Sequence, residues 1–236
     1  MCISLKGTTS ANRFRDRHRP VRAGIKYHER GKSAGCSGSL LMLCMNIVAV
    51  YMHPSWDSFN GAVFQAVQEK ALYQQWTTFA PAVEKMNPLL TIEEYKQSID
   101  GRYPPELEEA QDQLREADHV LFFFPVWWGG FPAAGKGFID RVFAYGKAHE
   151  LEGEEPIPLL TGKRASLFFT TGTPPEVFEE KGFYDQTVGA IRDQLLEFCG
   201  LELHTVKHFG DVHQASDEDR QKMLQEAAEA AARLSE

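Results

Sequence analysis

The sequence predicts an α/β fold built on a parallel β-sheet. Short apolar runs alternate with longer amphipathic segments along residues 46–236. The runs 46–51 and 119–124 are almost wholly apolar, which is typical of strands buried on both faces. Strands that alternate with helices indicate βαβ units, and the sequence therefore predicts a layered fold with helices packed on a parallel sheet.

The first half of this region predicts three strands. The strand 46–51 precedes a helix that Ser58 can cap and whose apolar residues fall on one face. Residues 75–80 are β-prone but lack a clean apolar run, so we predict an edge strand there. Residues 85–105 carry many turn signals and predict a long excursion before the strand 119–124.

The second half continues the alternation. A helix over 132–143 begins at a proline, whose missing N–H costs little at a helix start. The run 165–170 predicts another strand, and an amphipathic helix over 187–198 ends at Gly200. The remaining elements are a strand over 201–206 and a last helix capped by Ser216.

Charge divides the chain into two parts. Residues 1–45 hold nine Lys/Arg and two Asp/Glu, whereas residues 46–236 hold 16 and 31, a net charge of −15. We expect one domain over 46–236, and its acidity argues against nucleic-acid binding. The basic segment has three interpretations: a start site set too early, with translation from Met42 or Met45; a disordered tail; or a targeting peptide.

Cysteine and membrane signals are weak. The four cysteines form no C-x-x-C pair, so we expect neither a disulfide framework nor a zinc site. His204, His208 and His213 lack the spacing of a helical ligand pair, and we predict no metal. The apolar stretch 40–52 is interrupted by Asn46 and is too short to span a bilayer. We therefore expect a cytoplasmic protein.

Ligands of open α/β sheets bind beyond the carboxyl ends of the strands. The loop 52–60 follows the first strand and ends at a helix N-terminus, which favours a phosphate group. Ser55, Ser58 and Asn60 add small polar groups. A plain capped turn explains this loop equally well.

Two further loops lie at predicted strand ends. Trp127 and Trp128, followed by Gly129 and Gly130, offer a flat apolar wall for a planar ligand and close backbone approach. The alternative is one core tryptophan and one that covers an interface. The loop 170–175 supplies hydroxyls and amides for the edge of a heterocycle, or forms a stiff turn.

Together these loops resemble a known family. The segments that carry the resemblance are His53-Pro54 with Ser58-Phe59-Asn60, Phe124-Pro125-Val126-Trp127-Trp128, Lys136 through Phe143, and Thr170-Thr171-Gly172. They are similar to the flavodoxin-like NAD(P)H:quinone oxidoreductases, from about Asn46 to the last helix. The resemblance implies a flavodoxin-like three-layer fold, a five-stranded parallel sheet of order 2-1-3-4-5, a bound flavin, and a homodimer with active sites at the subunit interface.

The resemblance also assigns site residues. Those expected at the flavin phosphate region are His53, Ser58, Phe59 and Asn60. Those expected along the isoalloxazine are Pro125, Val126, Trp127, Trp128 and Gly129. Those expected at its pyrimidine edge are Thr170, Thr171, Gly172 and Thr173. Trp127, Trp128 and Gly130 are expected to bind the substrate.

One departure concerns proton handling. The best-known members of the family carry a tyrosine and then a histidine after the Thr-Thr-Gly loop, where this chain has Phe178 and Tyr184. Only Tyr184 can donate a hydrogen bond, so it is the catalytic group that we predict.

The implied reaction is a two-electron reduction of quinones by NAD(P)H. A hydride passes to the flavin and then to a quinone in the same slot, which gives ping-pong kinetics. The resemblance favours FAD, with FMN as the alternative, and leaves NADH or NADPH open. Two other functions stay possible at this point: a flavodoxin-type electron carrier, and a regulatory subunit of a potassium efflux system.

Overall fold

The computed structural model describes residues 44–71 and 74–234, and the predictions made for residues 1–43 fall outside these ranges. The strands are β1 (Asn46–Tyr51), β2 (Gln75–Phe79), β3 (His119–Pro125), β4 (His149–Glu152), β5 (Glu155–Pro158), β6 (Lys163–Thr170) and β7 (Leu201–Phe209). The helices are α1 (Phe59–Lys70), α2 (Ile92–Ile99), α3 (Pro105–Glu116), α4 (Ala133–Val142), α5 (Pro175–Glu180), α6 (Phe183–Ile191), the π-helical turn Arg192–Leu196, α7 (Glu197–Cys199) and α8 (Asp217–Ala232).

The central sheet has five parallel strands in the order β2-β1-β3-β6-β7. The strands β4 and β5 form a separate antiparallel hairpin. Counted along the sheet strands alone, the order is 2-1-3-4-5, so the predicted fold class and topology are confirmed. The weakly signalled edge strand is β2, which pairs with β1 on one side only.

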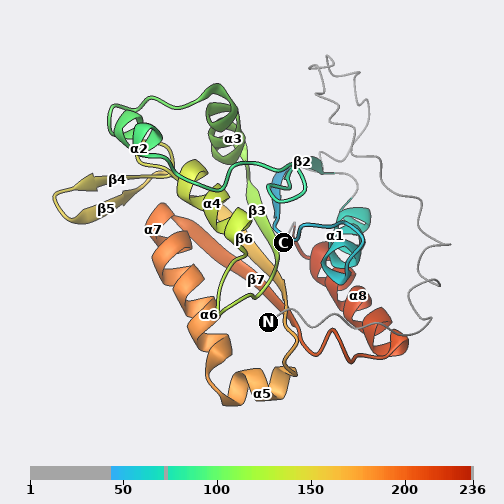
Figure 1. The fold of residues 1–236 in the computed structure, drawn as a ribbon. Helices are drawn as coiled ribbons and strands as arrows, with labels where there is room; N and C mark the ends of the chain where they lie inside the picture. Colours follow the sequence, from blue (N-terminus) through green and yellow to red (C-terminus); the bar gives the residue numbers. More distant parts are fainter. Residues whose placement is uncertain (1–43, 72–73, 235–236) are drawn as a thin grey trace, which may run out of the picture. The chain divides into compact units, whose positions relative to one another are not determined.

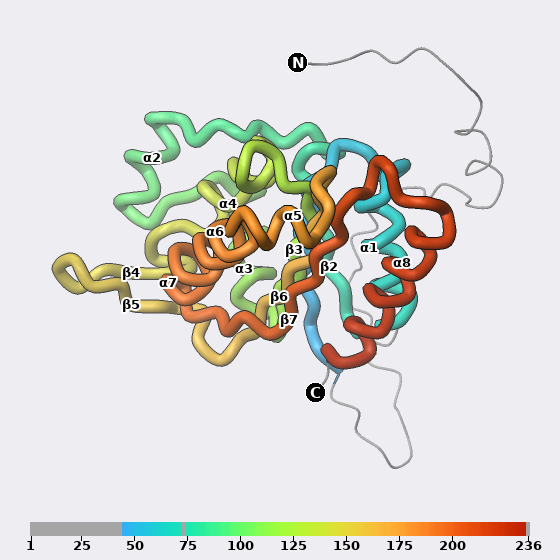
Figure 2. The backbone as a smooth tube through the Cα atoms, turned by 90° about the horizontal axis from the view of Figure 1, so that it is seen from below, coloured from blue at the N-terminus to red at the C-terminus, as the bar shows by residue number. Residues whose placement is uncertain are grey.

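Helices cover both faces of the sheet, as Figure 1 shows. Alternate residues of β1 point to opposite faces: Ile47 and Ala49 join one core, and Val48 and Val50 the other. The helices α1 and α8 pack together over the first face, and Figure 2 shows them side by side. The helices α3, α4 and α6 contribute buried residues to the second core.

The structure corrects three sequence predictions. The excursion 85–105 contains the helix α2, which begins at a Thr91–Glu94 capping box but buries no residue. The hairpin β4–β5 was not predicted. The helix predicted from residue 187 begins at Phe183 and continues through a π-helical turn before Gly200, at φ 87°, ends it.

No helix within the described ranges is long and apolar enough to cross a membrane.

Candidate functional site

The parallel register brings the predicted loops to one edge of the sheet. Tyr51 pairs with Phe123, Pro125 with Thr170, and Thr170 with Phe209. The segments that follow β1, β3, β6 and β7 therefore leave the sheet at the same end, at adjacent positions. This placement creates one candidate site from four separate parts of the chain.

The loop after β1 is held by the buried side chain of Tyr51. Its hydroxyl donates to the Ser55 carbonyl at 2.7 Å and lies 3.0 Å from the Ser58 hydroxyl. Its ring stacks on Trp56 with centroids 4.0 Å apart. Burial raises the pKa of Tyr51 to about 12, so this phenol stays a donor. The loop is thus preformed against the start of α1.

The first turn of α1 keeps two amide donors for a ligand. The Ser58 hydroxyl caps the helix by accepting from Gly61 N at 3.1 Å. Within the described residues, the N–H groups of Phe59 and Asn60 make no hydrogen bond. Unpaired first-turn amides and the helix dipole favour an anionic group at this point.

Two side chains connect this loop to the other two. Buried Asn60 donates from Nδ2 to the Thr170 hydroxyl at 2.9 Å. The His53 ring meets Trp127 edge to face, with centroids 6.1 Å apart, and its Nδ1 bonds within its own loop to Ser55. The structure therefore brings together the predicted residues of all three loops, with Asn60 as an internal bridge.

The loop after β3 is a tight turn that displays an indole. Trp127 and Gly130 exchange backbone hydrogen bonds of 3.0 and 3.2 Å around Trp128 and Gly129. These two central residues have φ of 54° and 83°, as in type I′ turns. Trp128 is fully exposed and Trp127 is 44% exposed. A tryptophan in the left-handed region stores strain, and such strain concentrates at functional sites.

The loop after β6 is fixed by the segment after β7. Thr171 N donates to Phe209 O at 3.0 Å, and Asp211 N donates to Thr173 O at 3.1 Å. Space beside Gly172 is limited, since an added Cβ would lie 3.1 Å from the His213 ring. Among the described residues, nothing accepts from the N–H groups of Gly172 and Thr173. These amides are donors available to a ligand edge.

Phe178 and Tyr184, at the positions where the resemblance implies a tyrosine and a histidine, both lie near His208. Phe178 is buried against Phe169 and His208. The Tyr184 ring is half-buried, 6.1 Å from the ring of His208, and burial raises the pKa of its phenol. The catalytic role of Tyr184 stays a prediction.

Sequence reasoning considered His208 only as a metal ligand. Its Nε2 lies 2.8 Å from the Thr171 hydroxyl, so it belongs to the site through the third loop. The sequence signal that could have placed His208 in the site is its position near the carboxyl end of the strand β7. No cluster of three or more His, Cys, Asp or Glu within the described ranges could hold a metal ion.

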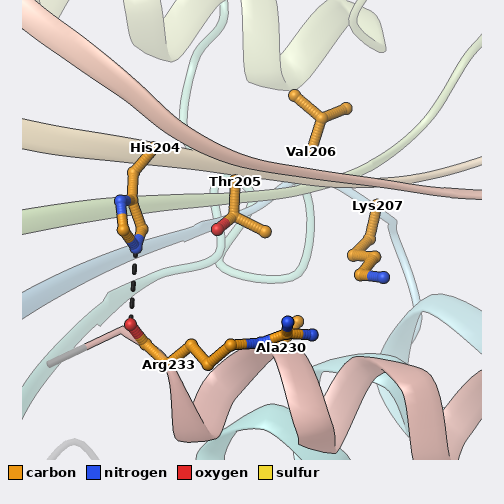
Figure 3. Close-up of a pocket in the computed structure, with 6 residues that line it drawn as sticks. All are labelled: His204, Thr205, Val206, Lys207, Ala230 and Arg233. Carbon is orange, nitrogen blue, oxygen red and sulfur yellow. Dashed lines mark hydrogen bonds between the residues drawn. The ribbon is translucent and has the colours of Figure 1, made fainter. Parts of the chain in front are cut away.

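A shallow hollow of about 350 Å³ lies elsewhere, between β7 and α8 (Figure 3). Its lining residues are His204, Thr205, Val206, Lys207, Ala230 and Arg233. None of them is a predicted site residue, and the Arg233 carbonyl lies 3.4 Å from His204 Nε2. We therefore place the candidate site at the strand ends, where donors and aromatic rings converge.

Comparison with known proteins shows relatives that cover most of this chain. A Haemophilus influenzae protein described as an uncharacterized NAD(P)H oxidoreductase is 30% identical over 188 residues, which cover 78% of this chain and 93% of that protein. The rat ribosyldihydronicotinamide dehydrogenase [quinone] is 28% identical over 200 residues, covering 75% and 87%.

Solved structures show the same architecture. The NAD(P)H:quinone oxidoreductase from Methanothermobacter marburgensis is 25% identical with a TM-score of 0.72, over 81% of this chain and 99% of that one. An FMN-dependent NADH-azoreductase from Bacillus anthracis, solved with FMN, is 16% identical with a TM-score of 0.67, over 80% and 99%, and so shows the fold alone. A family model described as the flavodoxin-like fold matches residues 45–234, and the chain therefore belongs to that family.

Proposed function

We propose that this protein is a flavin-dependent NAD(P)H dehydrogenase (quinone). One observation carries the proposal. Two exposed indoles meet two pairs of backbone N–H groups at one edge of the sheet. Among the described residues, neither Phe59 and Asn60 nor Gly172 and Thr173 have an acceptor for these N–H groups. One pair suits a phosphate and the other suits the polar edge of a heterocycle. The indoles suit a flat ring system between them. The names of the relatives support the same enzyme class.

Each loop has a distinct part in holding the flavin. The first turn of α1, with His53, Ser58, Phe59 and Asn60, binds the phosphate region. The segment from Pro125 to Gly129 lies along the ring system, and Thr170 through Thr173 face its pyrimidine edge. The flavin supplies the hydride chemistry, whereas the protein orients it and stabilises negative charge on it.

Substrates use the exposed side of the site. The two indoles are exposed, and on this proposal nicotinamide and quinone bind in turn beside Trp127, Trp128 and Gly130, which gives ping-pong kinetics. Tyr184 remains the candidate catalytic group, a hydrogen-bond donor that stabilises negative charge on the flavin. The cofactor we propose is FAD, with FMN as the alternative that the azoreductase neighbour binds. The mass of the released flavin decides between them, and rates with NADH and NADPH identify the donor.

A homodimer and a cytoplasmic location belong to the same proposal. The helix α2 exposes Ile92, Tyr95 and Ile99 at 58%, 53% and 63%, and the hairpin exposes Leu151 and Ile157. In Figures 1 and 2, α2 and the hairpin lie on the same side of the sheet. Apolar surface of this kind marks protein interfaces. Light scattering should give twice the 26.6 kDa mass of one chain.

Purified protein tests the proposal directly. We expect a yellow protein that oxidises NADH or NADPH only when a quinone is added, with parallel lines in double-reciprocal plots. An electron carrier would bind flavin without quinone turnover, and a regulatory subunit would show little turnover of its own. Protein that holds no flavin, even after incubation with FAD and FMN, would exclude the proposed function.

Trp128→Asn separates stability from function. Asparagine tolerates a positive φ, so the free energy of unfolding should rise by about 1 kcal/mol. Loss of the indole should weaken flavin retention or raise the quinone KM, because the ring system loses one wall. Thermal melts and steady-state kinetics measure the two effects. A variant that keeps both flavin retention and quinone KM would remove Trp128 from the site.

A further inference from the structure

The half-buried side chain of His208 packs against three aromatic rings. It stacks on Phe169 at 4.7 Å between centroids and packs against Phe178 at 4.9 Å and Tyr184 at 6.1 Å. Burial lowers its pKa to about 4, so the imidazole is neutral at neutral pH. A neutral imidazole has one N–H, and its tautomer depends on its hydrogen-bond partners.

The polar partner of His208 determines which nitrogen carries the proton. Thr171 Oγ1 lies 2.8 Å from His208 Nε2 and 2.8 Å from the carbonyl oxygen of Thr173. The Thr171 hydroxyl has one proton, and a carbonyl can only accept. When that proton goes to Thr173 O, Nε2 must donate to Oγ1. This arrangement satisfies both contacts, whereas the other tautomer satisfies only one.

We propose that His208 is a positioning residue for the flavin-binding loop, which it holds through a chain from Nε2–H to the Thr171 hydroxyl to the Thr173 carbonyl. The inference rests on the proposed function. The chain turns the Thr171 hydroxyl inward and fixes the peptide groups on either side of Gly172. The loop then presents its amide donors, from Gly172 and Thr173, to the ligand.

The position of His208 in the fold supports this role. It comes from the edge strand β7, where it pairs in register with Phe169, one residue before the loop. Thr171 N also donates to the carbonyl of the next β7 residue, Phe209, at 3.0 Å. Backbone and side chain thus tie the loop to β7 at adjacent positions. The aromatic rings pack against the imidazole while its Nε2 faces Thr171.

Two substitutions at His208 isolate its donor. His208→Gln keeps an N–H at a similar reach, whereas His208→Leu keeps the volume and removes the donor. We expect His208→Leu to weaken flavin affinity about tenfold and His208→Gln by no more than about threefold. The midpoint potential of bound flavin should become more negative in His208→Leu only, because loosened amides stabilise the reduced form less. His204→Leu, on the same strand, is the control.

A double-mutant cycle tests whether His208 acts through Thr171. In a Thr171→Val background, His208→Leu should change flavin affinity less than about twofold. Equal effects of His208→Leu in both backgrounds would overturn the inference. The inference would also be overturned if His208→Gln lost as much flavin affinity as His208→Leu, because lost packing alone would then explain both losses.

The tautomer can be measured without flavin. Long-range ¹H–¹⁵N spectra of the flavin-free protein should show His208 with its proton on Nε2, and a proton on Nδ1 would overturn the proposal. If the wild-type protein and His208→Leu bind flavin equally well, this inference alone is refuted. Wild-type protein that binds no flavin refutes the proposed function and this inference with it.

Discussion

Replacing Gly61 by alanine is expected to lower the free energy of unfolding by about 3 kcal/mol and to weaken flavin binding. An added Cβ would lie 2.1 Å from the carbonyl oxygen of Trp56 and 2.9 Å from its carbonyl carbon. Both are backbone atoms, so the loop 52–57 must move as a unit. Forced overpacking of this kind costs about 1–3 kcal/mol and sometimes more.

The loss should extend to function because Trp56 stacks on Tyr51. A shifted loop moves the preformed start of α1 and its unpaired amides. Gly189→Ala is the matched control, since nothing lies within 4 Å of its added Cβ within the helix α6. That change should raise stability by up to about 1 kcal/mol. Denaturant titration and flavin titration of both variants measure the difference, and equal results for both would contradict the close approach at Gly61.

Replacing Glu94 by glutamine should release the helix α2. Arg141, 6% exposed, donates from Nη2 and Nε to Glu94 at 2.6 and 3.1 Å, and from Nη1 to Asn87 O at 2.8 Å. Removing the charge of Glu94 leaves the buried Arg141 guanidinium without its counter-ion, at a cost of about 3 kcal/mol. Because α2 buries no residue, we expect local release in place of global unfolding.

Hydrogen exchange of the α2 amides is the sensitive measurement. Protection should fall by about a hundredfold or more, which corresponds to about 3 kcal/mol, while the sheet keeps its protection. Glutamine preserves the capping box with Thr91, so the loss reports the charge. Glu93→Gln, exposed on the same helix, is the control and should change little. If α2 carries the dimer interface, Glu94→Gln should also weaken dimerisation.

Acid should reproduce this release. The pKa of Glu94 is lowered from its usual 4.5, first by the hydrogen bond from Arg141. A lowered carboxyl pKa means that the pair stabilises the fold above pH 4.5. That contribution is lost as pH falls through the lower pKa of the folded state. The acid-dependent loss of α2 protection should disappear in Glu94→Gln, whose α2 is already released at neutral pH, and stay unchanged in Glu93→Gln.

The elements of this fold that can be predicted from the sequence are those with a clear pattern in their own residues. The strands β1, β3, β6 and β7 are read from apolar runs, and Ser58 and Ser216 cap their helices as expected. The helix α2 carries one local signal, its Thr91–Glu94 capping box, but it buries no residue and is held by the pair of Glu94 with Arg141 from a distant helix. The hairpin β4–β5 escapes prediction because exposed glutamates and prolines replace an alternating apolar pattern.

In the candidate site too, some features can be predicted from the local sequence and others cannot. Its loops are recognisable because aromatic, small and hydroxyl residues follow buried strands. The positive φ of Trp128 is a backbone property that its residue type argues against. The contact between His208 and Thr171 depends on the pairing of β6 with β7 and on a register shift within that pair. Such tertiary registers are set by the assembled sheet and have no local signature.

The position of the candidate site at the carboxyl ends of several strands also has a consequence for folding kinetics. The residues of the candidate site, spread from residue 53 to residue 208, meet only after β1 has paired with β3, β3 with β6 and β6 with β7. Such long-range pairings are slow to form because loop closure precedes their stabilisation. We therefore expect the proposed flavin to stabilise the finished sheet and not the transition state before it. It lengthens the lifetime of the folded chain while leaving the rate of folding nearly unchanged.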